Sequence, residues 1–445
     1  MRQLIKQILP APLKKFLIAV KFKTIDSYQK KKLAKRMQRK HQELLAGLRG
    51  KEKIRVVFLA IHKSVWKVDP VFQKMLADPF FDPIILVCPY TVYGKERMWQ
   101  DMNECYEYFE QKNYPLLSSY NKEEQRWISL NEVDPDIVFF TNPHNLTRKE
   151  YYEDAYLNYL SCYVPYHHEV VNNPEQFNQR FHSAQWRIFA SNHKVLNLYQ
   201  ELSSSEGKNV IVSGYPAMES LLSKLDSFSE CLKSWKVNDE RLRVIWAPHH
   251  SVEQTNETPY STFLEYAYFF QQLSKKYKDK VVWSFKPHPL LKQKLYLHPD
   301  WGVDITDKYY SYWESQSFTQ LDEGEYSELF CASNAMIHDS GSFLAEYLYV
   351  GKPVLYNIST INKGDFYSKF GLEALEACYL SYEQKDIEGF IKRLIDRLDI
   401  KPKHKKFLDE HVSKYHSKTT PTKIIIDELV KSIRFTPSEL YKAKL

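Results

Sequence analysis

Residues 335–356 constrain the fold more than any other stretch of this chain. A short apolar run at 335–337 leads into Asp339-Ser340-Gly341-Ser342, then an amphipathic stretch and, after Gly351, a second apolar run at 354–356. The pattern predicts a strand, a tight turn, a helix and a second strand, which is the repeating unit of a helix-covered parallel sheet. In such a sheet the turn lies at the carboxyl end of its strand, where N–H groups and hydroxyls can meet a phosphate. Alternatively, the two serines only cap the helix.

The same alternation of buried strands and helices recurs along most of the chain. We expect strands at 54–61, 81–87, 137–140, 162–164, 188–190, 210–212, 244–247, 281–285, 335–338 and 353–356. The expected helices lie at 26–48, 95–112, 122–130, 193–202, 262–276, 325–332, 343–350, 383–398 and 422–434. Strands that alternate with helices indicate an α/β fold with parallel sheets. Because residues 227–240 are polar and lack a strong period, we expect the linker between two domains there.

Glycine and cysteine usage excludes several classes of protein. Neither half has a Gly-x-Gly-x-x-Gly turn, and the 12 glycines of the chain form no Walker loop, which argues against NAD and ATP chemistry. The six cysteines are scattered without a Cys-x-x-Cys pair, which argues against a disulfide framework and a zinc site. We expect no cofactor and no metal.

Positive charge is concentrated at the amino terminus. Residues 1–55 hold 17 basic and 3 acidic side chains, a net charge of +14, whereas the other 45 basic and 52 acidic side chains give −7. Apolar residues recur at near-helical spacing among the lysines of residues 4–23. This pattern favours a helix lying on an anionic membrane over a nucleic-acid-binding arm; the other interpretation of the lysine-rich stretch after residue 25 is a solvated helix face. No apolar run reaches the roughly 18 residues that span a bilayer, and there is no secretory signal, so we expect a cytoplasmic protein on the inner face of the membrane.

Three polar segments follow predicted strands in the second half of the chain: Trp246-Ala247-Pro248-His249-His250, Lys286-Pro287-His288-Pro289 and His338-Asp339-Ser340-Gly341-Ser342. Their order and spacing resemble the carboxyl-terminal half of the CDP-glycerol glycerophosphotransferase family, which includes teichoic-acid and capsule polymerases and primases of bacteria. The similarity covers about residues 135–360. One departure is Pro165-Tyr166-His167-His168-Glu169, where the family often has His-Gly followed by Thr-Pro.

The resemblance implies the GT-B architecture, in which two Rossmann-like domains face each other across a cleft. We accordingly expect a basic amphipathic helical arm at 1–50, an acceptor domain at 51–226, a nucleotide-donor domain at 241–415, and a helix within 416–445 that crosses back to the first domain.

Transfer from a nucleotide requires groups that stabilise charge on the leaving phosphate. His288 can donate to a diphosphate oxygen, with Lys286, His249 and His250 at neighbouring strand ends. Ser340, Gly341 and Ser342 add hydroxyl and N–H donors, and Gly341 lets the backbone approach closely. Asp339 is suited to orient a histidine or to contact a hydroxyl, and Glu346 to bind the ribose diol or, alternatively, to be an ordinary surface or core-edge glutamate. Metal binding by His249 and His250 is disfavoured because neighbouring side chains on an extended segment diverge and no carboxylate is close in sequence.

Transfer also requires a base for the acceptor hydroxyl. An imidazole that titrates near neutrality is suited to this task, so His167 or His168 is the candidate and His144 the reserve. The alternative is an ordinary loop histidine.

The predicted function is transfer of glycerol phosphate, or a related polyol phosphate, from a CDP-linked donor to a polymer or lipid-linked acceptor. Two rivals remain: a GT-B glycosyltransferase that uses a nucleotide sugar for capsule synthesis, and a non-catalytic envelope-assembly protein of the same fold.

Overall fold

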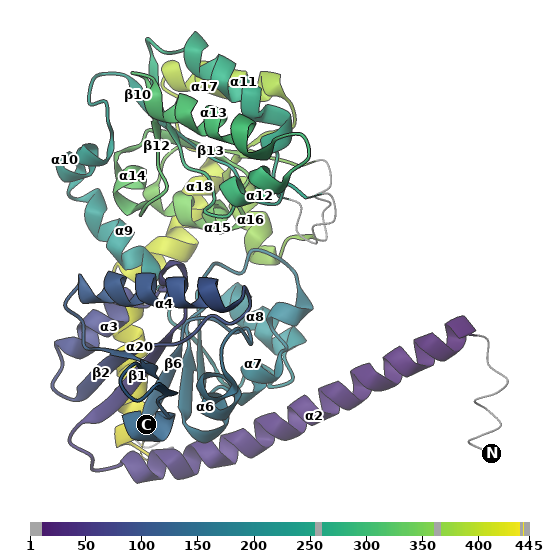
Figure 1. The fold of residues 1–445 in the computed structure, drawn as a ribbon, viewed down its shortest axis with the longest axis vertical. Helices are drawn as coiled ribbons and strands as arrows, with labels where there is room; N and C mark the ends of the chain where they lie inside the picture. Colours follow the sequence, from purple (N-terminus) through teal and green to yellow (C-terminus); the bar gives the residue numbers. More distant parts are fainter. Residues whose placement is uncertain (1–10, 254–259, 360–365, 437–438, 440–445) are drawn as a thin grey trace. The chain divides into compact units, whose positions relative to one another are not determined.

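The chain forms two compact units. The structure, a computed structural model, describes residues 11–253, 260–359, 366–436 and 439, with the backbone alone for 11–24. Unit 1 takes the described residues within Met1–Tyr166, Asn173–Ser213 and Thr422–Leu445, and unit 2 those within His167–Asn172 and Gly214–Pro421. Each is an α/β unit with its own parallel sheet and its own core (Figure 1).

Unit 1 is built on a seven-stranded parallel sheet. In spatial order its strands are β3 (Leu116–Ser118), β2 (Phe81–Val87), β1 (Ile54–Ala60), β6 (Ile137–Phe140), β7 (Leu160–Tyr163), β8 (Arg187–Ala190) and β9 (Val210–Val212). Its helices are α2 (Ala11–Leu48), α3 (Asp69–Leu76), α4 (Lys95–Glu110), α5 (Leu130–Val133), α6 (Glu153–Asn158), α7 (Arg180–Ala184), α8 (His193–Leu202) and α20 (Pro421–Arg434). Because β1 and β6 lie in the middle of the sheet, nearly all of their side chains are buried, as their apolar sequences require.

Unit 2 has a six-stranded parallel sheet with the same topology. Its spatial order is β12 (Thr319–Leu321), β11 (Val281–Phe285), β10 (Leu242–Ala247), β13 (Ala335–His338), β14 (Val354–Asn357) and β15 (Tyr379–Ser381). Its helices are α9 (Ala217–Leu225), α10 (Phe228–Cys231), α11 (Phe263–Lys276), α12 (Leu291–Leu297), α13 (Gly302–Ser315), α14 (Ser327–Ala332), α15 (Gly341–Glu346), α16 (Lys369–Ala377), α17 (Gln384–Ile395), α18 (Pro402–Phe407) and α19 (Lys414–His416), with a π-helical turn at Leu408–Ser413. The strand β10 therefore holds the place in unit 2 that β1 holds in unit 1.

The amino-terminal segment is a single long helix. Figure 1 shows α2, in purple, as one continuous helix. Its carboxyl-terminal half buries Leu33, Met37 and Leu45 against the rest of unit 1. The part of the predicted amphipathic stretch before residue 11 lies outside the described residues. None of the helices in the described part of the chain has the length and hydrophobicity needed to cross a bilayer.

One predicted helix is wrong. Residues 122–130 form mainly a hairpin, β4 (Tyr120–Asn121) with β5 (Arg126–Trp127), instead of a helix. The Asn121 carboxamide accepts the N–H groups of residues 123 and 124, and Gln125 takes a positive φ of 48°, which together make the turn. Stacking of Trp127 on Trp99 then holds the hairpin on α4.

The boundary between the units differs from the predicted linker. The main segment of unit 2 begins at Gly214, and residues 227–240 are part of it rather than a connection. Cys231 and Trp235 are buried, and the Trp235 indole donates to the Leu329 carbonyl of α14. Polar composition in this stretch therefore marks an exposed helix face, not a linker. Near the carboxyl terminus, Arg187 of β8 pairs with Glu428 of α20 at 2.9 Å, so α20 packs on unit 1.

Candidate active site

Three neighbouring strands of unit 2 bring the predicted segments together. The strand β10 pairs with β11 on one side and with β13 on the other, so Pro248-His249-His250, Lys286-Pro287-His288 and Asp339-Ser340 follow adjacent strand ends. Backbone bonds from His288 N to Pro248 O, at 3.1 Å, and from Lys286 N to Trp246 O, at 2.8 Å, continue the pairing past the strands.

Three half-buried imidazoles gather at this edge, and we call His249, His250 and His288 the histidine cluster. Ring centroids lie 4.2 Å apart for His249 and His250, 4.1 Å for His250 and His288, and 5.3 Å for His249 and His288. The expectation that His249 and His250 diverge is wrong, because the chain bends at His250 instead of continuing as a strand. The Nδ1 atom of His250 is buried and has no hydrogen-bond partner among the described residues, which leaves it able to pair with a ligand.

Backbone N–H groups fix the tautomers of two of these rings. The Nδ1 atom of His249 accepts the Ser251 N–H at 3.2 Å, and Nδ1 of His288 accepts the Leu290 N–H at 3.1 Å. A neutral imidazole whose Nδ1 accepts must carry its proton on Nε2. Each ring is therefore an Nε2–H donor. Donors of this kind suit an anion. The ring nitrogens of the three histidines also lie within 4.8 Å of one another, a spacing that could hold a metal ion, although a metal-bound histidine almost always donates from its other nitrogen and His249 and His288 accept there.

The electrostatics of the cluster favour neutral imidazoles beside a cation. Burial, then the neighbouring His250 and the Lys294 ammonium, lowers the pKa of His288 to about 3. Burial, and then Lys294, lowers the pKa of His250 to about 4, and burial holds the pKa of His249 well below its usual value. Near neutral pH the rings are uncharged donors, and the neighbouring cation is the Lys294 ammonium of α12, which is paired with Glu253 at 2.7 Å. The sequence patterns did not point to Lys294. It could have been found as a lysine in the first turn of the helix that follows His288.

Asp339 holds the cluster in place from β13. Its Oδ1 accepts the His249 N–H at 2.6 Å, and Oδ2 accepts the N–H and hydroxyl of Thr262 at 2.6 and 2.8 Å. Burial raises the pKa of this carboxyl to about 6, against the lowering effect of those donors. The predicted roles of Asp339 were to orient a histidine or to contact a hydroxyl. The geometry favours the first, because Asp339 holds the backbone N–H of His249.

The turn after β13 differs in part from expectation. Ser340 occupies the N-cap position of α15, but its side chain makes no capping hydrogen bond, so helix capping does not account for it. A Cβ at residue 341 would lie 2.7 Å from the Tyr260 ring and hydroxyl, which explains the glycine. The backbone of Gly341 is thus closely approached by the Tyr260 side chain, whereas the prediction was a close approach to a ligand. Tyr260 also packs edge-on against His249, at 5.0 Å. Ser342 is exposed.

Lys286 and Glu346 are buried away from solvent. The Lys286 ammonium donates to the carbonyls of Gly324, at 2.6 Å, and Asp322, at 3.4 Å, so it ties β11 to the loop after β12. We therefore remove Lys286 from the predicted phosphate-binding set. Glu346 is 2 % exposed and neighbours the Tyr326 phenol, whose pKa is raised by burial and by this carboxylate. Glu346 is thus not a surface residue.

The two candidate bases belong to unit 2, not to the first domain as predicted. The segment 167–172 docks on residues 366–368 through an antiparallel bridge between Val171 and Tyr367 and a 2.9 Å bond from Asn172 N to Phe366 O. The Tyr367 hydroxyl reaches that of Tyr356 at 3.1 Å, and the Phe366 ring packs on Tyr260 at 5.2 Å. Contacts within unit 2 therefore connect the segment 167–172 to the histidine cluster.

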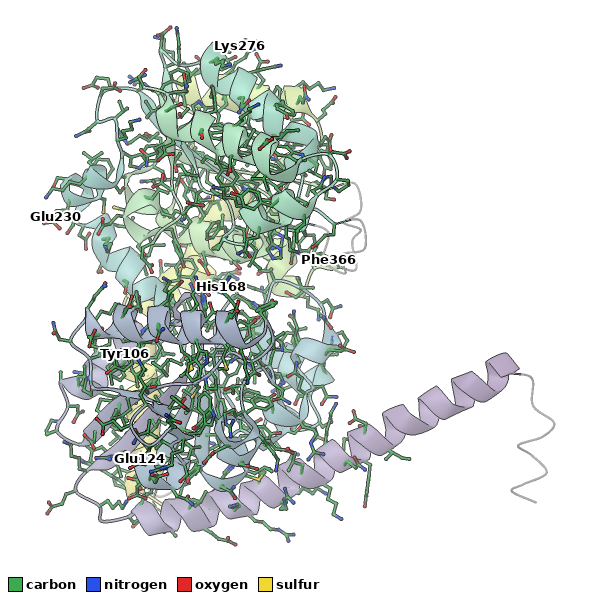
Figure 2. All side chains as sticks on the ribbon, viewed as in Figure 1. Tyr106, Glu124, His168, Glu230, Lys276 and Phe366 are labelled. Carbon is green, nitrogen blue, oxygen red and sulfur yellow. The ribbon has the colours of Figure 1, made fainter. Side chains whose placement is uncertain are left out.

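The structure separates His167 from His168. His168, which Figure 2 labels, is 1 % exposed. It packs against Tyr215, Tyr349 and Phe370. His167 is half-buried, and its Nδ1 donates to the His168 carbonyl at 2.9 Å. A ring that donates from Nδ1 has its lone pair on Nε2. His167 therefore has the tautomer of a general base, opposite to that of His249 and His288. The reserve candidate, His144, lies in unit 1 with Gln179 and Tyr166 each 3.4 Å from a ring nitrogen.

Comparison with known families identifies the family of the chain. The family model of CDP-glycerol:poly(glycerophosphate) glycerophosphotransferase matches residues 162–412, more than half of the chain. The chain belongs to this glycerophosphotransferase family. The matched region begins in β7, contains the segment 167–172 and the whole histidine cluster, and ends shortly after α18.

Solved structures that resemble this chain show its fold. The wall teichoic acid polymerase TagF has 14% sequence identity and a TM-score of 0.57, and the match covers 95% of this chain and 97% of that one. UDP-GlcNAc 2-epimerase from Neisseria meningitidis, bound to UDP-GlcNAc, has 15% identity and a TM-score of 0.55, with 85% of this chain and 100% of that one covered. Such likeness establishes a GT-B type α/β fold with two Rossmann-like units. A sequence search among curated proteins gave no match.

The motifs did not point to a further histidine at the end of a central strand, in unit 1. His62 follows β1, and its Nδ1 accepts the Ser64 N–H at 3.1 Å with the Ser64 hydroxyl 2.7 Å away. His249 and Ser251 repeat this arrangement after β10, the equivalent strand of unit 2. The detectable signal was a His-x-Ser sequence directly after the central strand of each sheet.

Proposed function

We propose that the protein transfers a glycerol-phosphate unit, or a related polyol phosphate, from a CDP-linked donor to a hydroxyl of a polymer or lipid-linked acceptor in the bacterial cell envelope. One observation carries the proposal: unit 2 holds imidazoles of opposite tautomer. His249 and His288 present N–H donors, whereas His167 presents a lone pair. Phosphoryl transfer to a hydroxyl needs one group of each kind.

The proposed step balances without a metal or cofactor. The Nε2 atom of His167 takes the proton of the acceptor hydroxyl, and the acceptor oxygen forms a bond to the phosphorus that bears the polyol. The bond from this phosphorus to the bridging diphosphate oxygen breaks, and CMP leaves with the electron pair. Negative charge grows on the CMP phosphate, where the Nε2–H groups of His249 and His288 stabilise it more in the transition state than in the ground state.

Other side chains complete the proposed donor site. Lys294 contributes positive charge, and Ser340, whose hydroxyl does not cap α15, donates to the diphosphate. Buried Glu346 is proposed to bind the ribose diol. Asp339 acts by holding the His249 backbone.

His62 of unit 1 is proposed to be an N–H donor for a phosphate group, because its Nδ1 accepts the Ser64 N–H. The basic helix α2 is proposed to place the protein on the inner face of the membrane, where a lipid-linked acceptor is found.

Donor selectivity tests the proposal. Purified protein should release CMP from CDP-glycerol in the presence of a glycerophosphate acceptor, and should give no nucleoside diphosphate from UDP- or CDP-linked sugars. Release of a nucleoside diphosphate from a sugar donor would identify a glycosyltransferase instead. Binding of the polymer with no turnover of any donor would indicate the non-catalytic envelope protein.

A substitution at Gly371 tests the segment 167–172, which carries the proposed base His167, without removing any functional group. A Cβ at residue 371 would lie 2.0 Å from the Val170 carbonyl oxygen, so Gly371→Ala must push the segment 167–172 away. Because a displacement of about 1 Å can cost about 10²-fold in rate, we expect turnover to fall by about that factor while CDP-glycerol affinity stays nearly normal. The control is Gly389→Ala on α17, where nothing lies within 4 Å of the added Cβ. Normal turnover by a folded Gly371→Ala variant would contradict the placement of the base.

Asp339 predicts a pH dependence of donor affinity. Its folded-state pKa of about 6 lies above the unfolded value, so its contribution to folding is most favourable at acid pH and decreases as pH rises through 6. Donor affinity should change in the opposite direction. Both carboxyl oxygens accept backbone N–H groups, so a proton on either oxygen weakens one of the bonds that hold His249 and Thr262. Affinity for CDP-glycerol, measured by calorimetry, should weaken as pH falls below about 6, well above the pKa of His250 and His288. In the Asp339→Asn variant, the affinity for CDP-glycerol should be low at every pH and should not change near pH 6. A variant whose affinity still changes near pH 6 would show that another group causes the pH dependence.

A further inference from the structure

Unit 1 contains a groove beneath α2, of about 530 Å³. Its walls are the residues of α2 from Tyr28 to Gln42, the segment that leads into β8, and residues 204–209 before β9. Because these segments precede their strands, the groove lies at the amino ends of the sheet. Residues such as His62 and His144 follow strands and lie at the opposite edge, so the groove is separate from the proposed transfer chemistry.

Unpaired polar groups form the floor of the groove. His41, Ser183 and Gln185 line it and are 4 %, 3 % and 2 % exposed. Among the described residues there is no hydrogen-bond partner for His41 Nε2, Ser183 Oγ, either amide atom of Gln185, or Asn209 Oδ1. Burial of several unsatisfied polar atoms around one space is unfavourable unless a bound group pairs with them. The Ser183 hydroxyl and the Gln185 amide can donate, whereas the carbonyl oxygens of Gln185 and Asn209 can only accept. The floor therefore suits a ligand that carries both acceptor oxygens and hydroxyl groups, as a phosphoglycerol does.

The rim of the groove is strongly basic. It carries four lysines, an arginine and a single acid, namely Lys31, Lys32, Lys35, Lys208, Arg187 and Glu206. Glu206 is engaged by Lys208 at 2.6 Å and by Lys31 at 4.0 Å, and Arg187 is paired with Glu428. Lys32 and Lys35 therefore add charge that Glu206 does not balance. An anionic ligand fits this rim.

We propose that the groove binds the phosphate-containing headgroup of an anionic glycerophospholipid. The helix that roofs the groove continues without a break to residue 11, and the sequence of 11–24 alternates lysines with Leu, Phe and Val side chains. Where this stretch meets the groove, Ile25 is 41 % and Tyr28 68 % exposed. A headgroup can thus enter a polar, basic groove while its acyl chains remain beside an apolar and basic helix, an arrangement that a soluble anion would not need.

Vesicle binding by the full-length protein tests this site. Binding to phosphatidylcholine vesicles with and without phosphatidylglycerol is measured by sedimentation for two charge-matched variants on α2. Lys32→Gln/Lys35→Gln alters the rim, whereas Arg36→Gln/Arg39→Gln removes the same charge from exposed positions that do not line the groove. We expect about a tenfold loss of affinity for the phosphatidylglycerol vesicles in the rim variant and a much smaller loss in the control. Equal losses would mean general electrostatic attraction and would overturn the proposal.

The floor gives a test that keeps the charge constant. Gln185→Leu removes two unpaired buried atoms, so the lipid-free variant should melt at the same or a higher temperature while binding phosphatidylglycerol vesicles several-fold more weakly. Unchanged vesicle binding by this folded variant would overturn the proposal.

Inorganic phosphate and soluble poly(glycerol phosphate) serve as competitors. Displacement of the vesicles only at high phosphate concentration supports a lipid site, whereas tight polymer binding that depends on Gln185, without vesicle binding, would assign the groove to the polymer and refute it.

Discussion

Replacing His167 with glutamine should lower turnover by about 10²- to 10⁴-fold and leave affinity for CDP-glycerol nearly unchanged. The His167 Nδ1 donates to the His168 carbonyl, which leaves Nε2 as the proton acceptor. A glutamine amide can still donate to that carbonyl but cannot take a proton near neutral pH. The rate constant for CMP release with saturating donor and acceptor, compared with the calorimetric affinity for CDP-glycerol, separates the two effects.

The neighbouring histidine provides the control. His168 is enclosed by Tyr215, Tyr349 and Phe370, so His168→Leu should change thermal stability more than the turnover of the folded enzyme. The opposite pattern, with His167→Gln active and His168→Leu folded but inactive, would transfer the role of base to His168. Normal turnover in both variants would show that neither residue is the base, and would leave His144 as the remaining candidate.

Removing His288 or His249 should each lower turnover by about 10²- to 10³-fold, because each supplies one Nε2–H donor to the leaving phosphate. Their ring centroids lie 5.3 Å apart, close enough for both to act on one diphosphate. The double alanine variant should therefore lose less than the product of the two single losses. Turnover with saturating CDP-glycerol is the quantity to compare.

His298 provides the control, because its replacement removes an imidazole outside the histidine cluster. Its Nδ1 also accepts a backbone N–H, from Asp300 at 3.2 Å, but it is not a member of the histidine cluster. His298→Ala should keep normal turnover. Strictly multiplicative losses for His249 and His288, or a fully active His288→Ala enzyme, would show that the two rings do not share a phosphate.

The sequence predicted the central strands and the convergence of three polar segments, because buried apolar runs identify strands and parallel strands end at a common edge. The three-residue strands β3, β12 and β15 were missed, since each includes a polar residue and too few apolar ones to stand out. The equally short β9 was found because its sequence, Val-Ile-Val, is entirely apolar. The linker prediction failed because buried Cys231 and Trp235 are too sparse to outweigh the polar residues around them.

The roles of individual site residues were less predictable. No local pattern indicates that Gly371 admits the Val170 carbonyl, since the two residues are far apart in the sequence and meet only in the folded unit. Likewise, the adjacency of His249 and His250 depends on a bend after β10. The tautomers depend on which backbone N–H or carbonyl each ring meets, and only coordinates supply that information.

The central claim is that imidazoles of opposite tautomer divide the transfer between them, and long-range ¹⁵N–¹H correlation spectra of protein labelled with ¹⁵N-histidine test it most directly. Signals can be assigned by comparison with His167→Gln, His249→Ala and His288→Ala. At neutral pH we predict protonated Nε2 and unprotonated Nδ1 for His249 and His288, the reverse for His167, and perturbed Nε2–H resonances of His249 and His288 when CDP-glycerol binds. A spectrum in which His167 carries its proton on Nε2, or in which the cluster histidines do not respond to CDP-glycerol, would contradict the account.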